Sequence, residues 1–315
     1  MIKHRYAHEI DPNGGSAAAV LARMVQPGQR VLELGTGPGT VTRILHSKGC
    51  KVTGVEMDPE TLATCAPFCK RTLQANLEDP NWAAPLAGES FDAIICADVL
   101  EHLRDPRPLL NQLHGFLKPG GSVLMSLPNA SHLTIVASLL GGRFPYQKNG
   151  LLDHTHLKFY GREDLDVLLR ECGLLWQYWH TVQVDPAQAE LKTYWHQLDE
   201  ATQALLKNKC ADGEVYQHVV LAQPATETAH LNALILEKQR VKPQYEDQFL
   251  KLKEELSRIR ESEANAKETL KWTANQLENH KLSIAELKAE ILTLQQSTSW
   301  KITAPLRKLI QKIST

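Results

Sequence analysis

The residues with the clearest chemical use lie in the run Val31–Thr40, which reads V-L-E-L-G-T-G-P-G-T. A short apolar stretch that contains an acid, Glu33, leads directly into three glycines at alternate positions, Gly35, Gly37 and Gly39. A buried strand that ends in such a turn is typical of sites that hold a nucleotide. Glycine has no Cβ, so a ligand can approach the backbone closely and the chain can adopt a positive φ. The run therefore predicts a nucleotide-binding turn.

A second acid, Glu56, ends the next strand-like stretch and follows Gly35 by 21 residues. At this place in a nucleotide-binding sheet, one carboxylate can accept hydrogen bonds from both ribose hydroxyls. The alternative is a capping role, because Asp58 and Pro59 look like the start of a helix. The glycine turn ahead of Glu56 favours the ribose role.

The spacing of the glycines separates two families of nucleotide site. The dinucleotide fingerprint G-x-G-x-x-G requires a glycine where this chain has Thr40. The pattern E-x-G-x-G-x-G, from Glu33 to Gly39, instead resembles motif I of the class I S-adenosylmethionine-dependent methyltransferases. Residues 91–106 (F-D-A-I-I-C-A-D-V-L-E-H-L-R-D-P) resemble the segment after the fourth strand in the group that includes ubiquinone-type O-methyltransferases, and residues 116–121 (F-L-K-P-G-G) resemble the turn before its fifth strand.

The resemblance covers about residues 14–224 and implies a Rossmann-like, doubly wound α/β sheet with S-adenosylmethionine as the cofactor. It also implies which positions contact that cofactor, from the glycine turn and from the ends of the second, third and fourth strands. These positions are Glu33, Gly35, Gly37, Gly39, Glu56, Met57, Asn76, Leu77, Ala97 and Asp98. Asn76 and Leu77 match the place where the family contacts adenine.

The acceptor side of the site is indicated by histidines. Residues 153–160 (D-H-T-H-L-K-F-Y) resemble a D-x-x-H-x-x-x-F/Y element of small-molecule and sugar methyltransferases. Alternate positions of an extended stretch point the same way, so we expect His154 and His156 to share a face. Imidazole titrates near neutral pH and is the commonest general base, which makes His102, His154 and His156 the catalytic candidates. The histidines could instead tie a lid to the core, or share a metal with His102 or Asp98; we predict no metal.

The elements that position these residues can be placed from their patterns. We expect a helix over residues 16–24 with Ser16 as its cap, strands near residues 31–34, 51–56, 72–78, 91–96 and 122–127, and helices over 41–45 and 162–173. A loop or lid is expected over 145–153, a strand over 174–184, one helix over 186–209 and a closing strand over 214–222. The six cysteines are expected to be free thiols; Cys65 and Cys69 lie one helical turn apart without a second pair at zinc-site spacing.

Composition excludes some functions. A net charge of -1 and a pI near 6.9 give no reason to expect a nucleic-acid partner, and the N-P-P-Y type of motif found in many nucleic-acid amino-methyltransferases is missing from the sequence. The sequence contains neither a long apolar run nor the apolar core of a signal peptide. A cytoplasmic protein is expected, with peripheral contact at the inner face of the cell membrane as a further option.

The composition changes after residue 224. We expect an N-terminal arm over 1–13, a methyltransferase domain over 14–224, a linker over 225–246, a coiled coil over 247–297 and a basic amphipathic tail over 298–315. Over residues 249–294, a heptad pattern places Phe249, Leu256, Glu263, Leu270, Leu277, Ile284 and Ile291 at a, and Leu252, Ile259, Ala266, Thr273, His280, Leu287 and Leu294 at d. The e positions are mostly basic, which favours a parallel homo-oligomer over an antiparallel pair. A long helix folded back on the domain is the alternative.

Residues 297–309 (S-T-S-W-K-I-T-A-P-L-R-K-L) resemble an element at the ends of bacterial proteins that build surface polysaccharides. A basic amphipathic segment with a tryptophan could contact an anionic membrane or a glycosyltransferase, or cap the coiled coil. The whole sequence thus predicts a methyltransferase that acts on a sugar hydroxyl in bacterial surface glycan assembly. A quinone-like or other small acceptor is the first alternative, and a non-catalytic coiled-coil scaffold is the second.

Overall fold

The computed structural model describes residues 10–296 together with Thr303 and Arg307; within the C-terminal helix, the side chains described are those of residues 235, 251 and 253–296. Residues 1–9 of the predicted arm (1–13) lie outside the described residues, and so does all of the predicted tail (298–315) except Thr303 and Arg307. The chain divides into two compact units, residues 1–238 and residues 239–315.

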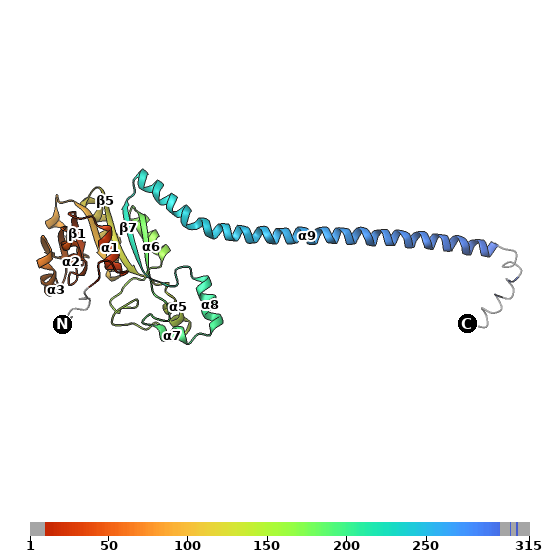
Figure 1. Cartoon of the computed structure of the whole chain (residues 1–315), viewed down its shortest axis with the longest axis horizontal. Coiled ribbons are helices and arrows are strands. Elements are labelled where there is room, and N and C mark those ends of the chain that lie inside the picture. Colours follow the sequence, from red (N-terminus) through yellow and green to blue (C-terminus); the bar gives the residue numbers. More distant parts are fainter. Residues whose placement is uncertain (1–9, 297–302, 304–306, 308–315) are drawn as a thin grey trace. The chain divides into compact units, whose positions relative to one another are not determined.

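One seven-stranded sheet organises the first unit, with the strand order β3-β2-β1-β4-β5-β7-β6. Figure 1 labels three of these strands, β1, β5 and β7. The first five strands run parallel and are β1 (Arg30–Leu34), β2 (Lys51–Glu56), β3 (Arg71–Gln74), β4 (Phe91–Ala97) and β5 (Leu117–Pro128). The last two, β6 (Leu174–Gln183) and β7 (Val215–Pro224), are antiparallel additions. The predicted doubly wound α/β fold is confirmed.

Helices cover both faces of the sheet because the buried strands are apolar on both sides. On one face, α1 (Ala17–Met24) and α2 (Thr40–Ser47) pack on Val31, Ile95 and Leu124. On the other face, α4 (Arg107–Leu113) and α6 (Arg162–Glu171) pack on Leu32, Ile94 and Val123. Neighbours in one strand thus enter different cores, as the two-residue period of a strand requires. As predicted, the side chain of Ser16 caps α1, accepting a hydrogen bond from the N–H of Ala19.

Short elements connect these layers. They are α3 (Pro59–Cys65) and the 3-10 turns η1 (Ala66–Phe68), η2 (Ala84–Leu86), η3 (Leu100–His102) and η4 (His114–Phe116). The predicted turn over residues 116–121 is mostly part of β5, because Leu117 pairs with Phe91 before the register shifts.

A small helical layer follows β5. It contains α5 (Leu133–Leu140), α7 (Lys192–His196) and α8 (Glu200–Lys209), packed around Leu151, Leu152 and Trp195. The prediction of one helix over residues 186–209 is wrong. The side chain of Asp199 accepts the N–H of Thr202 at 2.9 Å and so starts a separate helix.

The second unit is formed largely by the long helix α9 (Glu227–Gln296). The stretch predicted as a linker, residues 225–246, is helical from Glu227 onward. Apolar side chains at the a and d positions are exposed, for example Leu277 at 59% and Ile284 at 52%. The structure therefore confirms a long helix here, and its pairing into a coiled coil stays a prediction. Among the described residues, no helix combines the length and apolar character needed to cross a bilayer.

Candidate functional site

A cavity of about 580 Å³ opens at the carboxyl ends of the parallel strands. Its wall is formed by the segments that leave β1, β2, β3 and β4, which end at the same edge of the sheet. Ligands of open α/β sheets bind at this edge, because the loops there diverge and leave a crevice. We call this cavity the strand-end pocket.

The glycine turn forms the floor of the strand-end pocket. Gly35 has a φ of 66°, and a Cβ at this position would lie 2.8 Å from Cγ2 of Val99, so only glycine fits. The turn then passes Gly37, which also lines the pocket. Gly39 begins α2 with a φ of 85° and packs against Cys65, and it is not among the residues that line the pocket. Its role is to let the turn enter the helix.

Glu33 lies behind the turn and is 2% exposed. The hydroxyl of Thr42 donates a hydrogen bond to its Oε2 at 2.8 Å, which ties β1 to α2. Burial raises the pKa of Glu33 to about 8, against the smaller opposing effect of the Thr42 bond. The carboxyl group is therefore largely protonated at neutral pH and can also donate a hydrogen bond into the pocket.

Glu56 ends β2 and projects its carboxylate toward the turn. Its Oε2 accepts the N–H of Gly37 at 3.0 Å, and its Oε1 accepts the N–H groups of Met57 and Asp58 at 2.8 and 3.1 Å. The helix cap is a different residue, since Asp58 accepts the N–H groups at the start of α3. Glu56 is thus left as the acid on the pocket wall.

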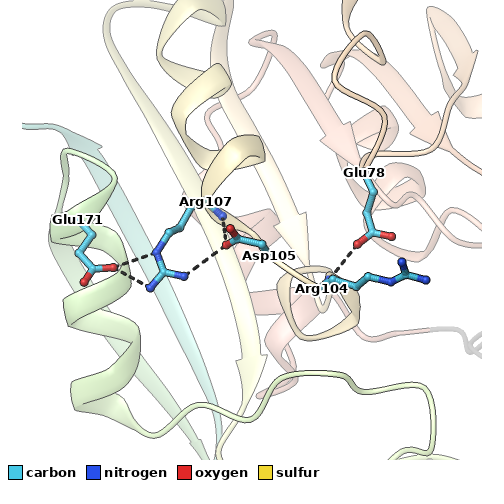
Figure 2. Close-up of polar contacts among 5 residues, drawn as sticks. All are labelled: Glu78, Arg104, Asp105, Arg107 and Glu171. Atoms are coloured by element: carbon cyan, nitrogen blue, oxygen red, sulfur yellow. Dashed lines mark hydrogen bonds and ion pairs between the residues drawn. The ribbon is translucent and has the colours of Figure 1, made fainter.

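The loop after β3 is fastened to the loop after β4. Oε1 of Glu78 accepts the backbone N–H of Arg104 at 2.9 Å, as Figure 2 shows. Arg107 in turn donates two hydrogen bonds to Oε2 of Glu171 on α6, at 3.0 and 2.8 Å, and contacts Asp105 (Figure 2). These contacts fix the edge of the pocket at which Asn76 and Leu77 lie.

Asp98, directly after β4, has a φ of 52°, an uncommon value for a residue with a side chain. Its N–H donates to Ser126, and its carboxylate accepts the Ser126 hydroxyl at 2.7 Å and the side-chain amide of Gln217 at 3.0 and 3.1 Å. Enclosure by the protein raises the pKa of Asp98, although these hydrogen bonds act in the opposite direction. The surrounding bonds hold a strained backbone in place at the pocket wall.

Two histidines meet on the far side of the pocket. The rings of His102 and His156 lie 4.9 Å apart. Nδ1 of His102 is 3.2 Å from the carbonyl of Thr155, and Nδ1 of His156 is 3.2 Å from the carbonyl of Leu151. A carbonyl can only accept, so each Nδ1 carries a proton, and in a neutral ring this leaves the lone pair on Nε2. Burial lowers the pKa of His156, and the electrostatic interaction with His102 lowers it further, which favours the neutral form of His156.

Glu101 lies beside this pair and is 1% exposed. Neither of its carboxylate oxygens has a hydrogen-bond partner among the described residues. Burial raises its pKa well above the ordinary value, and the nearby carboxylates of Asp98 and Asp153 add to the effect. One ligand atom each from Glu101, His102 and His156 lie within 4.8 Å of one another. Such a set could share a divalent cation, so the alternative of a metal stays open beside the prediction of none.

His154 lies apart from the other two candidates. Its side chain is 55% exposed, and its Nδ1 is 3.3 Å from the carbonyl of Gln147. The expectation that His154 and His156 share a face is wrong, because Asp153 accepts the N–H and hydroxyl of Thr155 and bends the chain into a turn.

Comparisons with known proteins identify the family. The profile of the family described as "Methyltransferase domain" matches residues 4–203. The chain belongs to this methyltransferase family. The resemblance inferred from the motifs is therefore confirmed, and so is the prediction of S-adenosylmethionine as the cofactor.

Curated relatives and solved structures with methyltransferase names are also similar to this methyltransferase. The ubiquinone biosynthesis O-methyltransferase of Pseudomonas aeruginosa is 28% identical over 151 residues, which cover 47% of this chain and 65% of the relative. The protein of the same name from Psychrobacter arcticus is 26% identical over 183 residues, covering 55% and 68%. The methyltransferase thus spans slightly less than two thirds of the length of the first relative.

Among solved structures, a putative methyltransferase from Bacillus halodurans has a TM-score of 0.47 at 16% identity, covering 67% of this chain and 99% of that one. An S-adenosylmethionine-dependent methyltransferase from Archaeoglobus fulgidus has a TM-score of 0.45 at 16% identity, covering 66% and 94%.

The chemical groups that line the strand-end pocket match those of S-adenosylmethionine. Glu56 offers acceptor oxygens for ribose hydroxyls, and Asp98 offers a carboxylate to a cationic group. Apolar side chains suited to a flat adenine ring line the same pocket: Met57, Leu77, Val99 and Leu103. Of the ten predicted cofactor positions, all except Gly39 line it.

Several lining residues of the methyltransferase were missed from the sequence. Tyr216 and Gln217 come from β7, and Gly150 comes from the predicted lid. The hydroxyl of Tyr216 donates to Oε1 of Glu190 at 3.1 Å, and the same oxygen accepts the N–H of Leu151 at 2.8 Å. No local motif marks Tyr216 and Gln217, because an antiparallel strand from the end of the domain brings them to the pocket.

Proposed function

We propose that this chain is an S-adenosylmethionine-dependent O-methyltransferase in which His102 and His156 serve the hydroxyl acceptor. The observation that carries the proposal is the histidine pair, whose rings lie 4.9 Å apart on the wall of the strand-end pocket. An imidazole whose Nδ1 carries the proton offers the lone pair of Nε2 to the proton of an attacking hydroxyl. A site for amine methylation would have less need of a base.

S-adenosylmethionine, when bound, supplies a methyl group on a sulfonium, which an oxygen nucleophile can attack in line. The chain's own residues chiefly hold the reactants in position, which is the main source of rate for such a transfer. Glu56 and the glycine turn would bind the ribose and the adjoining chain, and Asp98 would orient the cationic end. Held by Ser126 and Gln217, Asp98 has little freedom to move.

His156 would take the proton. Its Nδ1–H is directed to the carbonyl of Leu151 in the lid, which fixes the ring and leaves Nε2 as the base. Because burial lowers its pKa, His156 is neutral at physiological pH and ready to accept. Leu151 and Leu152 belong to the lid and are buried, so the lid shields this side of the pocket from water.

We propose a sugar hydroxyl as the acceptor, in the assembly of a bacterial surface glycan. A second hollow of about 610 Å³ supports this choice, since Glu190 is part of its wall and also holds the lid and Tyr216 of the strand-end pocket. Its lining is rich in groups that hydrogen-bond to sugars, namely Arg143, Gln147, Glu190, Thr193, Tyr194 and Gln197. The resemblance of the C-terminal segment to surface-polysaccharide proteins supports the same acceptor.

A quinone-like phenol is the second candidate. The relatives from Pseudomonas aeruginosa and Psychrobacter arcticus are named ubiquinone biosynthesis O-methyltransferases. Aromatic rings also gather beside His156: Phe159 lies 6.3 Å from its ring, and Phe144 lies 5.3 Å from Phe159 and 5.2 Å from Tyr146. A planar aromatic acceptor would stack favourably on such a group.

Residues 249–294 would join copies of the chain as a parallel coiled coil. The exposed apolar a and d side chains of α9 support this, because they need a partner to be buried. The tail would bring the enzyme to a glycosyltransferase or to the inner face of the membrane, which makes its location cytoplasmic and peripheral. A non-catalytic scaffold is the remaining alternative, although a scaffold would have no use for the paired histidines.

The test is a binding and transfer experiment on the full chain. We expect S-adenosylmethionine to bind in calorimetry and labelled methyl groups to pass to a nucleotide sugar or a sugar-terminated lipid. Transfer to catechols alone would favour the quinone-like candidate. Absence of cofactor binding would leave the scaffold as the better account.

A further inference from the structure

Two cysteines lie beneath the glycine turn, outside the lining of the strand-end pocket. Cys65 ends α3 and is fully buried, and Cys69 follows η1 and is partly buried. Their Sγ atoms are 3.8 Å apart. Sγ of Cys65 is also 3.3 Å from Oγ1 of Thr36, a residue of the turn itself. The two thiols are thus in contact with each other and with the cofactor-binding backbone.

Two glycines provide the space for this pair. A Cβ at Gly39 would lie 2.8 Å from Cβ of Cys65. A Cβ at Gly54, on β2, would lie 2.8 Å from the methyl of Thr36 and 3.0 Å from Sγ of Cys69. Because the packing leaves so little free volume, any movement of the sulfur atoms must displace the turn or β2.

The environment also activates Cys65, whereas the bond to Cys65 and burial raise the pKa of Cys69. The bond from Cys69, and a smaller contribution from Thr36, lower the pKa of Cys65 to about 7, although burial acts in the opposite direction. Among charged neighbours, Arg43 lowers this pKa and Glu56 raises it. A thiolate at neutral pH is the form that reacts with peroxides, and a second thiol within reach can resolve the product.

We propose that Cys65 and Cys69 are a redox modification site, and that their disulfide weakens cofactor binding by displacing the glycine turn. Hydrogen peroxide oxidises the Cys65 thiolate to a sulfenic acid and releases hydroxide, and the Cys69 thiol then attacks that sulfur, loses its proton and releases water. In sum, two thiols lose two electrons and two protons, and the peroxide becomes two water molecules. The effect on the cofactor rests on the proposed function, whereas the chemistry of the pair does not.

The coupling to the turn follows from distance. A disulfide bond is about 2.05 Å long, so the sulfur atoms must approach each other considerably. Cys65 would then leave its contact with Thr36, and the neighbours of Gly39 and Gly54 would shift. The glycine turn that holds Gly37 would then lose packing contacts on both sides, at Gly39 and at Gly54.

The test begins with the full-length protein treated with hydrogen peroxide. Trypsin cleaves after Lys51 and Lys70, so one peptide carries Cys65 and Cys69 and none of the other four cysteines. We expect this peptide to lose two hydrogen atoms and to regain them with dithiothreitol. S-adenosylmethionine affinity, measured by calorimetry, should fall about tenfold in the oxidised protein and recover on reduction, since one hydrogen bond and the turn it supports are lost.

Two variants sharpen the result. Cys69→Ser keeps a small polar group next to Cys65 and should bind the cofactor as the wild type does, but without sensitivity to peroxide. Cys210→Ser removes a partly buried cysteine at the end of α8 and should stay sensitive. Amide hydrogen exchange over residues 35–42 gives a readout without cofactor, and it should be faster after oxidation.

The outcomes separate this proposal from the proposed function. If the Cys65–Cys69 peptide stays reduced while Cys210 is oxidised, the pair is not a redox site. A disulfide that leaves both hydrogen exchange and cofactor affinity unchanged would overturn the coupling. If untreated protein fails to bind S-adenosylmethionine, the proposed function fails, and the peptide and exchange measurements still decide the redox site.

Discussion

The backbone N–H of Gly37 donates to the carboxylate of Glu56 at 3.0 Å, so the end of β2 is tied to the middle of the glycine turn. Met57 and Asp58 donate to the other oxygen of the same carboxylate. Three backbone donors therefore orient this acid before any ligand arrives, so the ribose site that we propose would be built in advance. Preorganisation of this kind lowers the cost of binding.

We expect Glu56→Ala to weaken S-adenosylmethionine binding by about tenfold to a hundredfold, because hydrogen bonds to a charged group contribute roughly 1.5–3 kcal/mol. Calorimetry on the purified chain measures this. Glu60→Ala is the matched control, since Glu60 is an exposed acid on α3 and is outside the pocket lining. Equal affinities for wild type and Glu56→Ala would mean that the carboxylate does not contact the cofactor.

The histidine pair should affect catalysis and leave cofactor binding intact. His156→Ala is expected to lower kcat by about 10²–10⁴, the usual contribution of a general base. His154→Ala is the control, since its ring is exposed and its residue does not line the pocket. Because the pKa of His156 is lowered from 6.5, the acid limb of the rate profile should lie below pH 6.5 in the wild type.

A chelator decides whether Glu101, His102 and His156 act as a general-base site or as a metal site. If imidazole alone accepts the proton, the rate should persist after extensive treatment with EDTA. Loss of activity that returns with added Mg²⁺ or Mn²⁺ would instead make Glu101, His102 and His156 ligands of a metal ion. The affinity for S-adenosylmethionine should be the same in both preparations, which shows that the protein is intact.

Glu33 should make stability depend on pH in a predictable direction. Its pKa is about 8 in the folded chain and 4.5 in the absence of burial, so the folded state keeps a proton that the unfolded state releases. The proton on Glu33 contributes its full share to the free energy of unfolding below pH 4.5, and this share is lost as pH rises toward 8. At 1.36 kcal/mol per pKa unit, the loss amounts to about 3–5 kcal/mol. Glu33→Gln, which stays neutral, should therefore gain stability relative to the wild type between pH 5 and 8.

Denaturant unfolding at several pH values across this range tests the Glu33 prediction. Glu60→Gln is a suitable comparison, because Glu60 is exposed on the surface of α3. Parallel stability curves for the wild type and Glu33→Gln would contradict a protonated Glu33 in the folded state.

The long helix should hold copies of the chain together. Light scattering of the full protein is expected to give a multiple of the chain mass of 35.3 kDa. The double change Leu277→Lys and Ile284→Lys puts charges at consecutive a positions and should yield monomers. The double change Asn275→Lys and Ala289→Lys adds the same charge at f positions, away from the seam, and should leave the mass unchanged. A monomeric mass for the wild type would contradict the predicted oligomer.

The cofactor half of the site could be predicted because its residues are local in sequence. Glu33 lies in β1, the three glycines follow that strand, and Glu56 ends β2, so motif and position coincide. The acceptor half could not be predicted in the same way. His102 and His156 meet only because the lid folds over η3, and the N–H of Leu157 donates to the carbonyl of Glu101 at 2.8 Å. Such long-range contacts depend on tertiary packing that no local pattern records.

Local patterns also failed where one side chain decides the outcome. The apolar pattern over residues 186–209 is compatible with one helix, and Asp199 divides it by capping a new one. Similarly, Asp153 turns the chain between two histidines that an extended strand would have aligned. In both cases a short polar side chain competes with the regular backbone pattern by bonding to nearby N–H groups.

The place of β7 in the sheet has a consequence for how the protein is made. This strand comes last in the domain but lies between β5 and β6, so β6 can pair only after synthesis has reached Pro224. The parallel strands β1–β5 and their glycine turn are complete much earlier and can assemble while the chain is still on the ribosome. Tyr216 and Gln217 join the pocket with β7, and α9 begins at Glu227. Synthesis thus completes the glycine turn first, then the part of the pocket wall that β7 supplies, and then α9.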